Sequence, residues 1–228
     1  MCGNEMINNK NVCVILPAYN AEKTLRKTYL EIPHHIVDSI ILVDDHSADN
    51  TFEIAKSLKI DTLVHPNNLG YGANQKTCYN AALRKAADII IMLHPDYQYT
   101  PKLIESMVAM ISNDVFDVVL GSRILGDSAL KTGMPVYKYF SNRILTFIQN
   151  ICVGKKLSEY HTGYRAYHRS VLESIPFQKN SDNFLFDNQV LVQIISRGFR
   201  IGEISCPVNY NKNASSISLF KSIRYGLG

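Results

Sequence analysis

Three polar side chains, His94, Asp96 and Gln98, follow directly after the apolar run 89–93. Such a run predicts a buried strand, and open α/β sheets bind their ligands at the carboxyl ends of these strands. Residues two apart in an extended segment point to the same side. The three side chains could therefore converge on one cation or one diphosphate, although an ordinary loop with an incidental aspartate is the alternative.

Two further apolar runs also end in polar loops. The run 12–16 predicts a buried strand that stops at Pro17, and the run 39–43 predicts a second one that ends at Asp44 and Asp45. If these strands are parallel to the first, their loops lie at the same edge of one sheet. Three polar loops at one edge indicate a site for a nucleotide more strongly than one loop does.

The rest of the chain alternates between helical and strand patterns. Strands that are apolar on both faces and interleaved with helices predict an α/β fold, with a mostly parallel central sheet flanked by helices. The longest expected helix, 135–153, has an apolar face. We expect helices over 21–31, 50–57, 70–87, 102–112, 135–153 and 185–197, further strands over 62–64, 115–120 and 201–208, and a turn that runs into a strand over 161–167.

The composition excludes several classes of protein. With 228 residues, 46% of them hydrophobic and 19% charged, the chain can bury a sizeable core. A net charge of +4 without a run of Lys or Arg argues against nucleic-acid binding. Five scattered cysteines without CxxC spacing indicate reduced thiols. We find neither a signal peptide nor a membrane-spanning run, so we expect a cytoplasmic protein, with peripheral contact to the inner face of the plasma membrane left open.

Seven collinear segments carry a resemblance to a known family. Together they resemble the family 2 glycosyltransferases of the GT-A fold, a Rossmann-like fold, and within them the polyprenyl-phosphate group that includes dolichol-phosphate mannose synthase. The segments are VILPAYNAEKTL (14–25), ILVDDHSADNT (41–51), NNLGYGANQKTCYNAAL (67–83), IIMLHPDYQYTP (90–101), VVLGSRI (118–124), TGYRAYHRSVL (162–172) and RGFRIGEISCPVNY (197–210).

The resemblance implies a site for a nucleotide sugar linked to UDP or GDP. Asp45 could accept hydrogen bonds from the base or ribose, and Gly70 and Gly72 could let the backbone approach the nucleotide. A loop or cap role for Asp45 and a plain turn for the glycines are the alternatives. The implied members of this site are Pro17, Tyr19, Val43, Asp45, Gly70, Gly72, Pro95 and Asp96.

The resemblance also implies a divalent cation, Mn²⁺ or Mg²⁺, at His94, Asp96 and Gln98. The family normally has an aspartate where this chain has His94, and imidazole suits softer ions than Mg²⁺. We therefore consider three cases. The site favours Mn²⁺, holds a metal through Asp96 and Gln98 with waters, or binds metal weakly.

Five residues are expected to be catalytic: Asp96, Arg123, Glu159, Arg165 and Asp187. The two arginines would neutralise the leaving diphosphate, unless they form surface ion pairs. The carboxylates of Glu159 and Asp187 are candidate bases for a hydroxyl acceptor. A surface charge is the alternative for Glu159, and a helix-capping role is the alternative for Asp187.

The predicted activity is transfer of a sugar, with inversion, to a polyprenyl phosphate. A saccharide hydroxyl in cell-surface polysaccharide assembly is the alternative acceptor, and a protein that binds a nucleotide sugar with little turnover is the second alternative. We expect one domain over 1–228, with a donor half (10–125) and an acceptor half (126–228) that ends in an amphipathic segment, 216–228. That segment and the helix over 135–153 could lie on a bilayer, or pack on the core or on a second copy of the chain.

Overall fold

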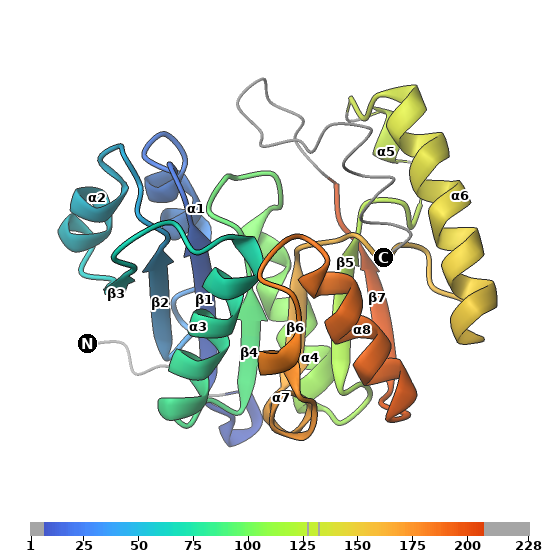
Figure 1. Ribbon diagram of the computed structural model, residues 1–228. Coiled ribbons are helices and arrows are strands. Elements are labelled where there is room, and N and C mark those ends of the chain that lie inside the picture. The colour runs from blue at the N-terminus through green and yellow to red at the C-terminus, as the bar shows by residue number, and fades with distance from the viewer. Residues whose placement is uncertain (1–6, 127, 132, 208–228) are drawn as a thin grey trace.

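A seven-stranded sheet forms the centre of the computed structural model, which describes residues 7–126, 128–131 and 133–207 (Figure 1). The strand order is β3-β2-β1-β4-β6-β5-β7, and only β6 runs antiparallel to its neighbours, β4 and β5. The predicted α/β fold with a mostly parallel sheet is therefore confirmed. The strands are β1 Val12–Ala18, β2 Ser39–Asp44, β3 Asp61–Val64, β4 Ile89–Met92, β5 Val118–Ser122, β6 Arg165–His168 and β7 Ile201–Ser205.

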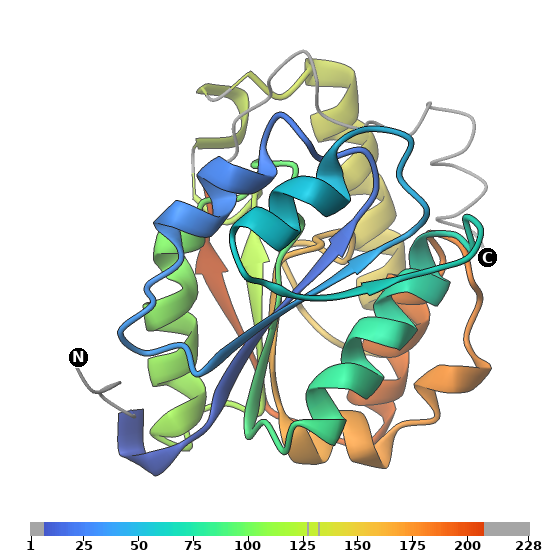
Figure 2. The same cartoon turned by 90° about the vertical axis from the view of Figure 1, so that its left-hand side faces the viewer.

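Helices cover both faces of this sheet (Figure 2). Alternate residues of β1 point into two different cores. Val12, Val14 and Leu16 join the core under α1 (Leu25–Glu31) and α4 (Ile104–Ser112). Cys13 and Ile15 join the core under α3 (Tyr71–Arg84) and α8 (Phe186–Ser196). The shorter helices α2 (Thr51–Ser57) and α7 (Arg169–Ser174) complete the layers, and the described cysteines are free thiols, as expected.

Several elements are shorter than the sequence predicts, because turns occupy their ends. The first helix begins at Leu25 and not at residue 21, because 21–24 forms a turn in which the Thr24 N–H donates to the carbonyl of Ala21. The helix expected to reach residue 87 ends at Arg84, before Ala86 adopts a φ of 55°. The strand expected from residue 115 begins at Val118, after a turn at Asp114.

The three polar loops lie at one edge of the sheet, as the sequence predicts. Strands β2, β1 and β4 are parallel neighbours, so the loops that follow them are adjacent. The first two loops are joined by hydrogen bonds between Asn20 and the segment 47–48. The side chain of Asn74, in the first turn of α3, donates to the carbonyls of Ala18 and Val43 and holds both strand ends together.

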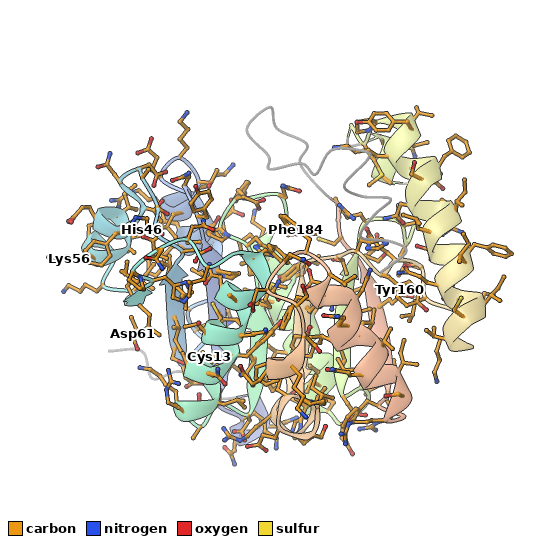
Figure 3. The ribbon with its side chains drawn as sticks, in the orientation of Figure 1. Cys13, His46, Lys56, Asp61, Tyr160 and Phe184 are labelled. Carbon is orange, nitrogen blue, oxygen red and sulfur yellow. The ribbon has the colours of Figure 1, made fainter. Side chains whose placement is uncertain are left out.

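Helix α6 (Val136–Val153) follows the short helix α5 (Ser128–Lys131) and lies outside the layers (Figure 1). Its attachment to the body is largely polar: Asn142, Thr146 and Asn150 form its inner stripe, and Asn150 exchanges two hydrogen bonds of 2.9 Å with the main chain of Leu157. The apolar residues expected near one face point outward: Tyr137, Phe140, Ile144, Phe147, Ile148 and Ile151 are 42–67% exposed. Figure 3 shows the side chains of α6 extending away from the sheet.

No helix in the described part of the chain is both long enough and apolar enough to cross a bilayer. The expected amphipathic segment 216–228 lies outside the described residues.

Candidate active site

The carboxylate of Asp45, at the end of β2, holds the segment that leads into α3. One oxygen accepts hydrogen bonds from His65 Nδ1 (2.7 Å) and from the Leu69 N–H (2.9 Å), and the other accepts from the Gly70 N–H (2.9 Å). Asp45 is only 3% exposed. The structure thus gives it a loop-holding role, and its expected contact with a base or ribose stays a prediction.

Tyr19 is the most accessible residue of the expected donor site. Its side chain is 56% exposed at the end of β1, whereas Pro17 and Val43 are buried in the strands. Pro95 is also buried, and its carbonyl accepts a hydrogen bond of 3.3 Å from the Thr28 hydroxyl. An exposed aromatic ring at this edge is suited to stacking on a base.

The glycines of the GYG motif make room for another part of the chain. A Cβ on Gly70, whose φ is +99°, would lie 2.8 Å from the carbonyl oxygen of Asp182. A Cβ on Gly72 would lie 2.9 Å from Phe186 Cβ, and the Gly72 N–H donates to Asp182 O over 2.8 Å. The backbone of these glycines therefore lies close to the segment before α8, a contact that neither the nucleotide role nor a plain turn predicted. The approach of these glycines to a nucleotide stays a prediction.

Asp96 and Gln98 come together, but His94 turns to a different partner. Both oxygens of Asp96 accept hydrogen bonds from Gln98, one from its N–H (3.1 Å) and one from its amide Nε2 (2.7 Å). His94 Nε2 instead lies 3.0 Å from the hydroxyl of Tyr71. Tyr97, which lies between Asp96 and Gln98 in the sequence, has a φ of 57°, and its hydroxyl donates to Glu31 on α1.

The side chains of Asp96 and Gln98 can hold a cation only if the substrate supplies further ligands. Among the described residues, no three His, Cys, Asp or Glu side chains are grouped to hold a metal. Mg²⁺ and Mn²⁺ are commonly held by one or two carboxylates together with phosphate oxygens and waters. The half-buried carboxylate of Asp96, at the open edge of the sheet, meets that requirement.

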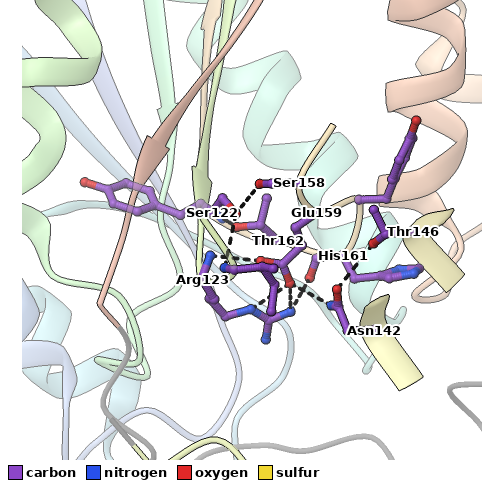
Figure 4. A network of polar contacts seen from close by, with 12 residues as sticks. Ser122, Arg123, Asn142, Thr146, Ser158, Glu159, His161 and Thr162 are labelled. Carbon is purple, nitrogen blue, oxygen red and sulfur yellow. Dashed lines mark hydrogen bonds and ion pairs between the residues drawn. The ribbon is translucent and has the colours of Figure 1, made fainter. Parts of the chain in front are cut away.

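A polar network joins β5 to the loop before β6 (Figure 4). The carboxylate of Glu159, which is completely buried, accepts from the main-chain N–H of Arg123 (2.9 Å), from its guanidinium and from Asn142 Nδ2 of α6 (3.0 Å). Arg123 also donates to the carbonyl of His161 over 3.2 Å. Arg123 is thus neither a freely moving surface residue nor fully buried, since its side chain is 16% exposed.

Both candidate bases accept hydrogen bonds from donors of the protein. Burial alone would raise the pKa of Glu159, but the charge and hydrogen bonds of Arg123 outweigh burial and lower this pKa. Asp187 is 8% exposed and accepts from Tyr71 (2.6 Å) and from Gln75 (3.2 Å). The expected base role is therefore wrong for Glu159, as is its surface alternative, and both oxygens of Asp187 are engaged by the protein.

Arg165 is a structural residue, which corrects the expectation that it meets the diphosphate. Its guanidinium is completely buried and donates to the carbonyls of Tyr160 (3.0 Å), Thr162 (2.8 Å) and Asp187 (2.9 Å). These bonds tie the loop before β6 to the start of α8. Since its N–H groups are directed at the main chain, Arg165 shapes the site from behind.

His161 lies in the same loop and is expected to make stability depend on pH. Burial lowers its pKa from 6.5 to about 4, and Arg123 and Arg165 lower it while Glu159 and Asp187 oppose the shift. Between these values the unfolded chain binds more protons than the native one, so the free energy of unfolding falls as the pH falls, by at most about 1.4 kcal/mol per pH unit. Urea unfolding at pH 7, 6 and 5 should show a smaller decrease for His161→Gln than for the wild type. His35→Gln, at an exposed position, is the control, and equal decreases in all three proteins would contradict the prediction.

Two residues with a clear place in the site received no role from the sequence: Tyr71 and Gly163. Tyr71 lies between the two glycines of GYG, and Gly163 lies in TGYRAY. A Cβ on Gly163 would lie 2.7 Å from His94 Cδ2, so this glycine makes room for the imidazole. Their presence inside the resembling motifs was the available signal, but their partner, His94, lies elsewhere in the sequence.

Two named relatives match most of this chain in sequence. The UDP-N-acetylglucosamine–dolichyl-phosphate N-acetylglucosaminyltransferase of Methanococcus voltae is 29% identical over 221 residues, which cover 90% of this chain and 88% of the relative. The polyprenol monophosphomannose synthase of Mycolicibacterium smegmatis is 22% identical over 214 residues and is covered to 79%.

A solved structure shows the same fold. Glucosyl-3-phosphoglycerate synthase from Mycobacterium tuberculosis, in complex with Mn²⁺ and UDP-glucose, superposes with a TM-score of 0.70 at 17% identity, covering 96% of this chain and 76% of that one. The sequence model of glycosyl transferase family 2 matches residues 13–175. Because that model matches most of its length and the solved synthase has the same fold, this chain belongs to glycosyl transferase family 2 and has the GT-A fold.

Proposed function

We propose that this protein transfers a sugar from a nucleoside-diphosphate donor to a polyprenyl phosphate, with inversion. The observation that carries the proposal is the engagement of Glu159 and Asp187 by protein donors. A hydroxyl acceptor needs a base within reach. A phosphate monoester has a second pKa of about 6 and is already an anion at neutral pH, so it needs none. Two relatives are named as an enzyme that acts on dolichyl phosphate and a synthase of polyprenol monophosphomannose, and both support this acceptor.

Arg123 and Asp96 are the residues to which we assign the leaving group. Arg123 is oriented by the hydrogen bonds from its Nε and Nη2 to Glu159, so its guanidinium lies at a fixed place near the edge of the sheet. Asp96, with the amide of Gln98 beside it, would hold a divalent cation, and Mn²⁺ in a solved GT-A neighbour supports this assignment. When bound, the cation supplies positive charge to the departing diphosphate.

A transfer assay with matched acceptors tests the proposal. The purified protein is given radiolabelled UDP- or GDP-sugars with Mn²⁺ and one of three acceptors: a polyprenyl phosphate, the corresponding polyprenol, or a soluble saccharide. We expect label in the lipid phosphate only. Label in the saccharide would establish the hydroxyl acceptor, and nucleotide-sugar binding without transfer to any acceptor would establish the alternative of little turnover.

The protein is also expected to gain stability from the nucleoside diphosphate alone. A ligand that binds only the native state adds about 2.7 kcal/mol at a hundredfold excess over its Kd. Thermal unfolding with UDP, GDP and ADP, each with and without Mn²⁺, should show a rise for one base that Mn²⁺ increases. No rise with any of the three would contradict the donor site at Tyr19 and Asp45.

The outer face of α6 supports contact with an anionic membrane. This face is apolar and exposed, and the segment 128–158 contains five cations, Lys131, Lys138, Arg143, Lys155 and Lys156, without any acidic residue. Exposed aromatic and aliphatic side chains flanked by cations favour the interface of a bilayer with negative headgroups. A lipid-bound acceptor would then be reached from that surface.

Sedimentation with vesicles checks this contact. Phe147→Asp, at a position 65% exposed, should weaken binding to anionic vesicles by about tenfold or more, because burying a phenylalanine contributes about 1.5–3 kcal/mol. Leu30→Asp, at an equally exposed position on α1, should bind as the wild type does. If the wild type stays in the supernatant at low salt and is a dimer that Phe147→Asp dissociates, the face is instead an interface between two copies.

A further inference from the structure

Three side chains from distant parts of the chain meet at the boundary between the loop after β4 and helix α8. Tyr71 is the first residue of α3, His94 follows β4, and Asp187 lies in the first turn of α8. The hydroxyl of Tyr71 donates to Asp187 Oδ2 over 2.6 Å and lies 3.0 Å from His94 Nε2. Tyr71 therefore connects the expected cation site with the other half of the sheet.

The number of protons available to the hydrogen bonds that join Asp187, Tyr71 and His94 determines the tautomer of His94. A phenol has one proton, and an ionised carboxylate has none, so the Tyr71 proton lies between the phenol and Asp187. The remaining contact of the phenol oxygen must be as an acceptor. His94 Nε2 is consequently the nitrogen that carries a proton, and in the neutral ring Nδ1 carries the lone pair.

The surrounding residues hold this arrangement in place. The ring of Tyr71 stacks on His94 with centroids 5.3 Å apart and on Phe184 with centroids 4.5 Å apart. Gln75 donates to the second oxygen of Asp187, and the absence of a side chain at Gly163 leaves the space that the imidazole occupies. The imidazole thus has contacts on its face, at Nε2 and at Cδ2.

We propose that Tyr71 is a positioning residue that holds His94 in the Nε2–H tautomer, with Asp187 as its anchor, so that Nδ1 is the nitrogen offered to the donor's cation. This inference rests on the proposed function, because it concerns the same site. Histidines that bind metals usually donate their other ring N–H to a carboxylate, a carbonyl or water, and loss of such a partner costs about 10–100-fold in metal affinity. Here the phenol of Tyr71 relays that contact to the carboxylate of Asp187.

Tyr71→Phe removes the relay and keeps the ring, and Tyr79→Phe is its matched control. Tyr79 lies two turns later on α3, is also buried, and donates to Gln75 and Tyr167, and no hydrogen bond or ring contact among the described residues joins it to His94. Long-range ¹H–¹⁵N spectra of protein labelled in its seven histidines report the tautomer of each ring, and the His94 signals are those lost in His94→Gln. We expect the Nε2–H pattern for His94 in the wild type and in Tyr79→Phe, and a mixed or reversed pattern in Tyr71→Phe.

Mn²⁺ binding gives a second readout that does not depend on turnover. Titration of Mn²⁺ in the presence of UDP, followed by electron paramagnetic resonance, should show a Kd at least about tenfold higher for Tyr71→Phe than for Tyr79→Phe. Asp187→Asn, which keeps the shape and removes the charge, should change both readouts in the same direction. If Tyr71→Phe does not fold, the two readouts of Asp187→Asn test the positioning role instead.

The outcomes separate this inference from the proposed function. An unchanged His94 tautomer and an unchanged Kd in both Tyr71→Phe and Asp187→Asn would overturn the positioning role, even if the enzyme transfers sugar to polyprenyl phosphate. A changed tautomer with no transfer to any acceptor would leave the positioning role intact and overturn the proposed function instead.

Discussion

Asp96→Ala is expected to lower kcat/KM for sugar transfer by about 10³-fold or more, because the leaving diphosphate loses the carboxylate that holds its cation. The structure supports the choice of this residue. Asp96 is half-buried at the open edge of the sheet, and its only described protein donor is the neighbouring Gln98. His94→Ala should lose less activity, by about 10–100-fold, because it removes a neutral ligand and leaves the carboxylate of Asp96 in place.

Steady-state kinetics with Mn²⁺ and with Mg²⁺ measure these effects. Asp96→Asn removes the charge but preserves the size of the side chain, so a similar loss of activity would show that the loss does not come from a displaced loop. Asp61→Ala, which removes an exposed partner of Lys85, is the control for loss of a carboxylate elsewhere. His94→Asp restores the residue type that the family normally has, and it should raise the activity with Mg²⁺ relative to Mn²⁺. An Asp96→Ala enzyme that keeps its activity would contradict the assignment of Asp96 as the residue that holds the cation.

Arg165→Met is expected to lower the free energy of unfolding by about 3–5 kcal/mol. The substitution leaves three buried main-chain carbonyls without their donor, and methionine fills most of the volume without replacing any of those bonds. Because whole domains are stable by only about 5–15 kcal/mol, this loss is a large fraction of the total.

Urea unfolding provides the measurement, with Arg197→Met as the control at an exposed position. Arg165→Lys should recover only part of the loss, because an ammonium group cannot donate in the forked geometry of a guanidinium. A stable Arg165→Met protein that fails only in catalysis would show that the guanidinium acts on substrate after all.

The edge of the sheet could be predicted from sequence because it depends on local patterns. Apolar runs that end in polar loops identify parallel strands and place their loops together, and the structure confirms this for the loops after β1, β2 and β4. The antiparallel direction of β6 could not be predicted in this way, since a buried strand is apolar on both faces whichever way it runs.

The partners of the charged residues could not be predicted, because they are set by packing between distant segments. Glu159 meets Arg123 across 36 positions, and Asp187 meets Tyr71 across 116. Motif matching places these residues near the site but does not distinguish a base from a carboxylate that holds an arginine. The face of α6 has a similar ambiguity, because an amphipathic pattern identifies two faces without saying which one meets the protein.

The bond from Asn142 to Glu159 has a consequence for which acceptors can be used. Glu159 joins α6 to Arg123, so the helix proposed to rest on the bilayer and the arginine assigned to the leaving group are held at a set separation. On a membrane, this separation would set the height above the lipid plane at which the sugar is transferred. A phosphate attached directly to its lipid lies at one such height, whereas a hydroxyl at the end of a growing saccharide moves further from the plane with every added unit. The enzyme would then add one sugar to each lipid and stop.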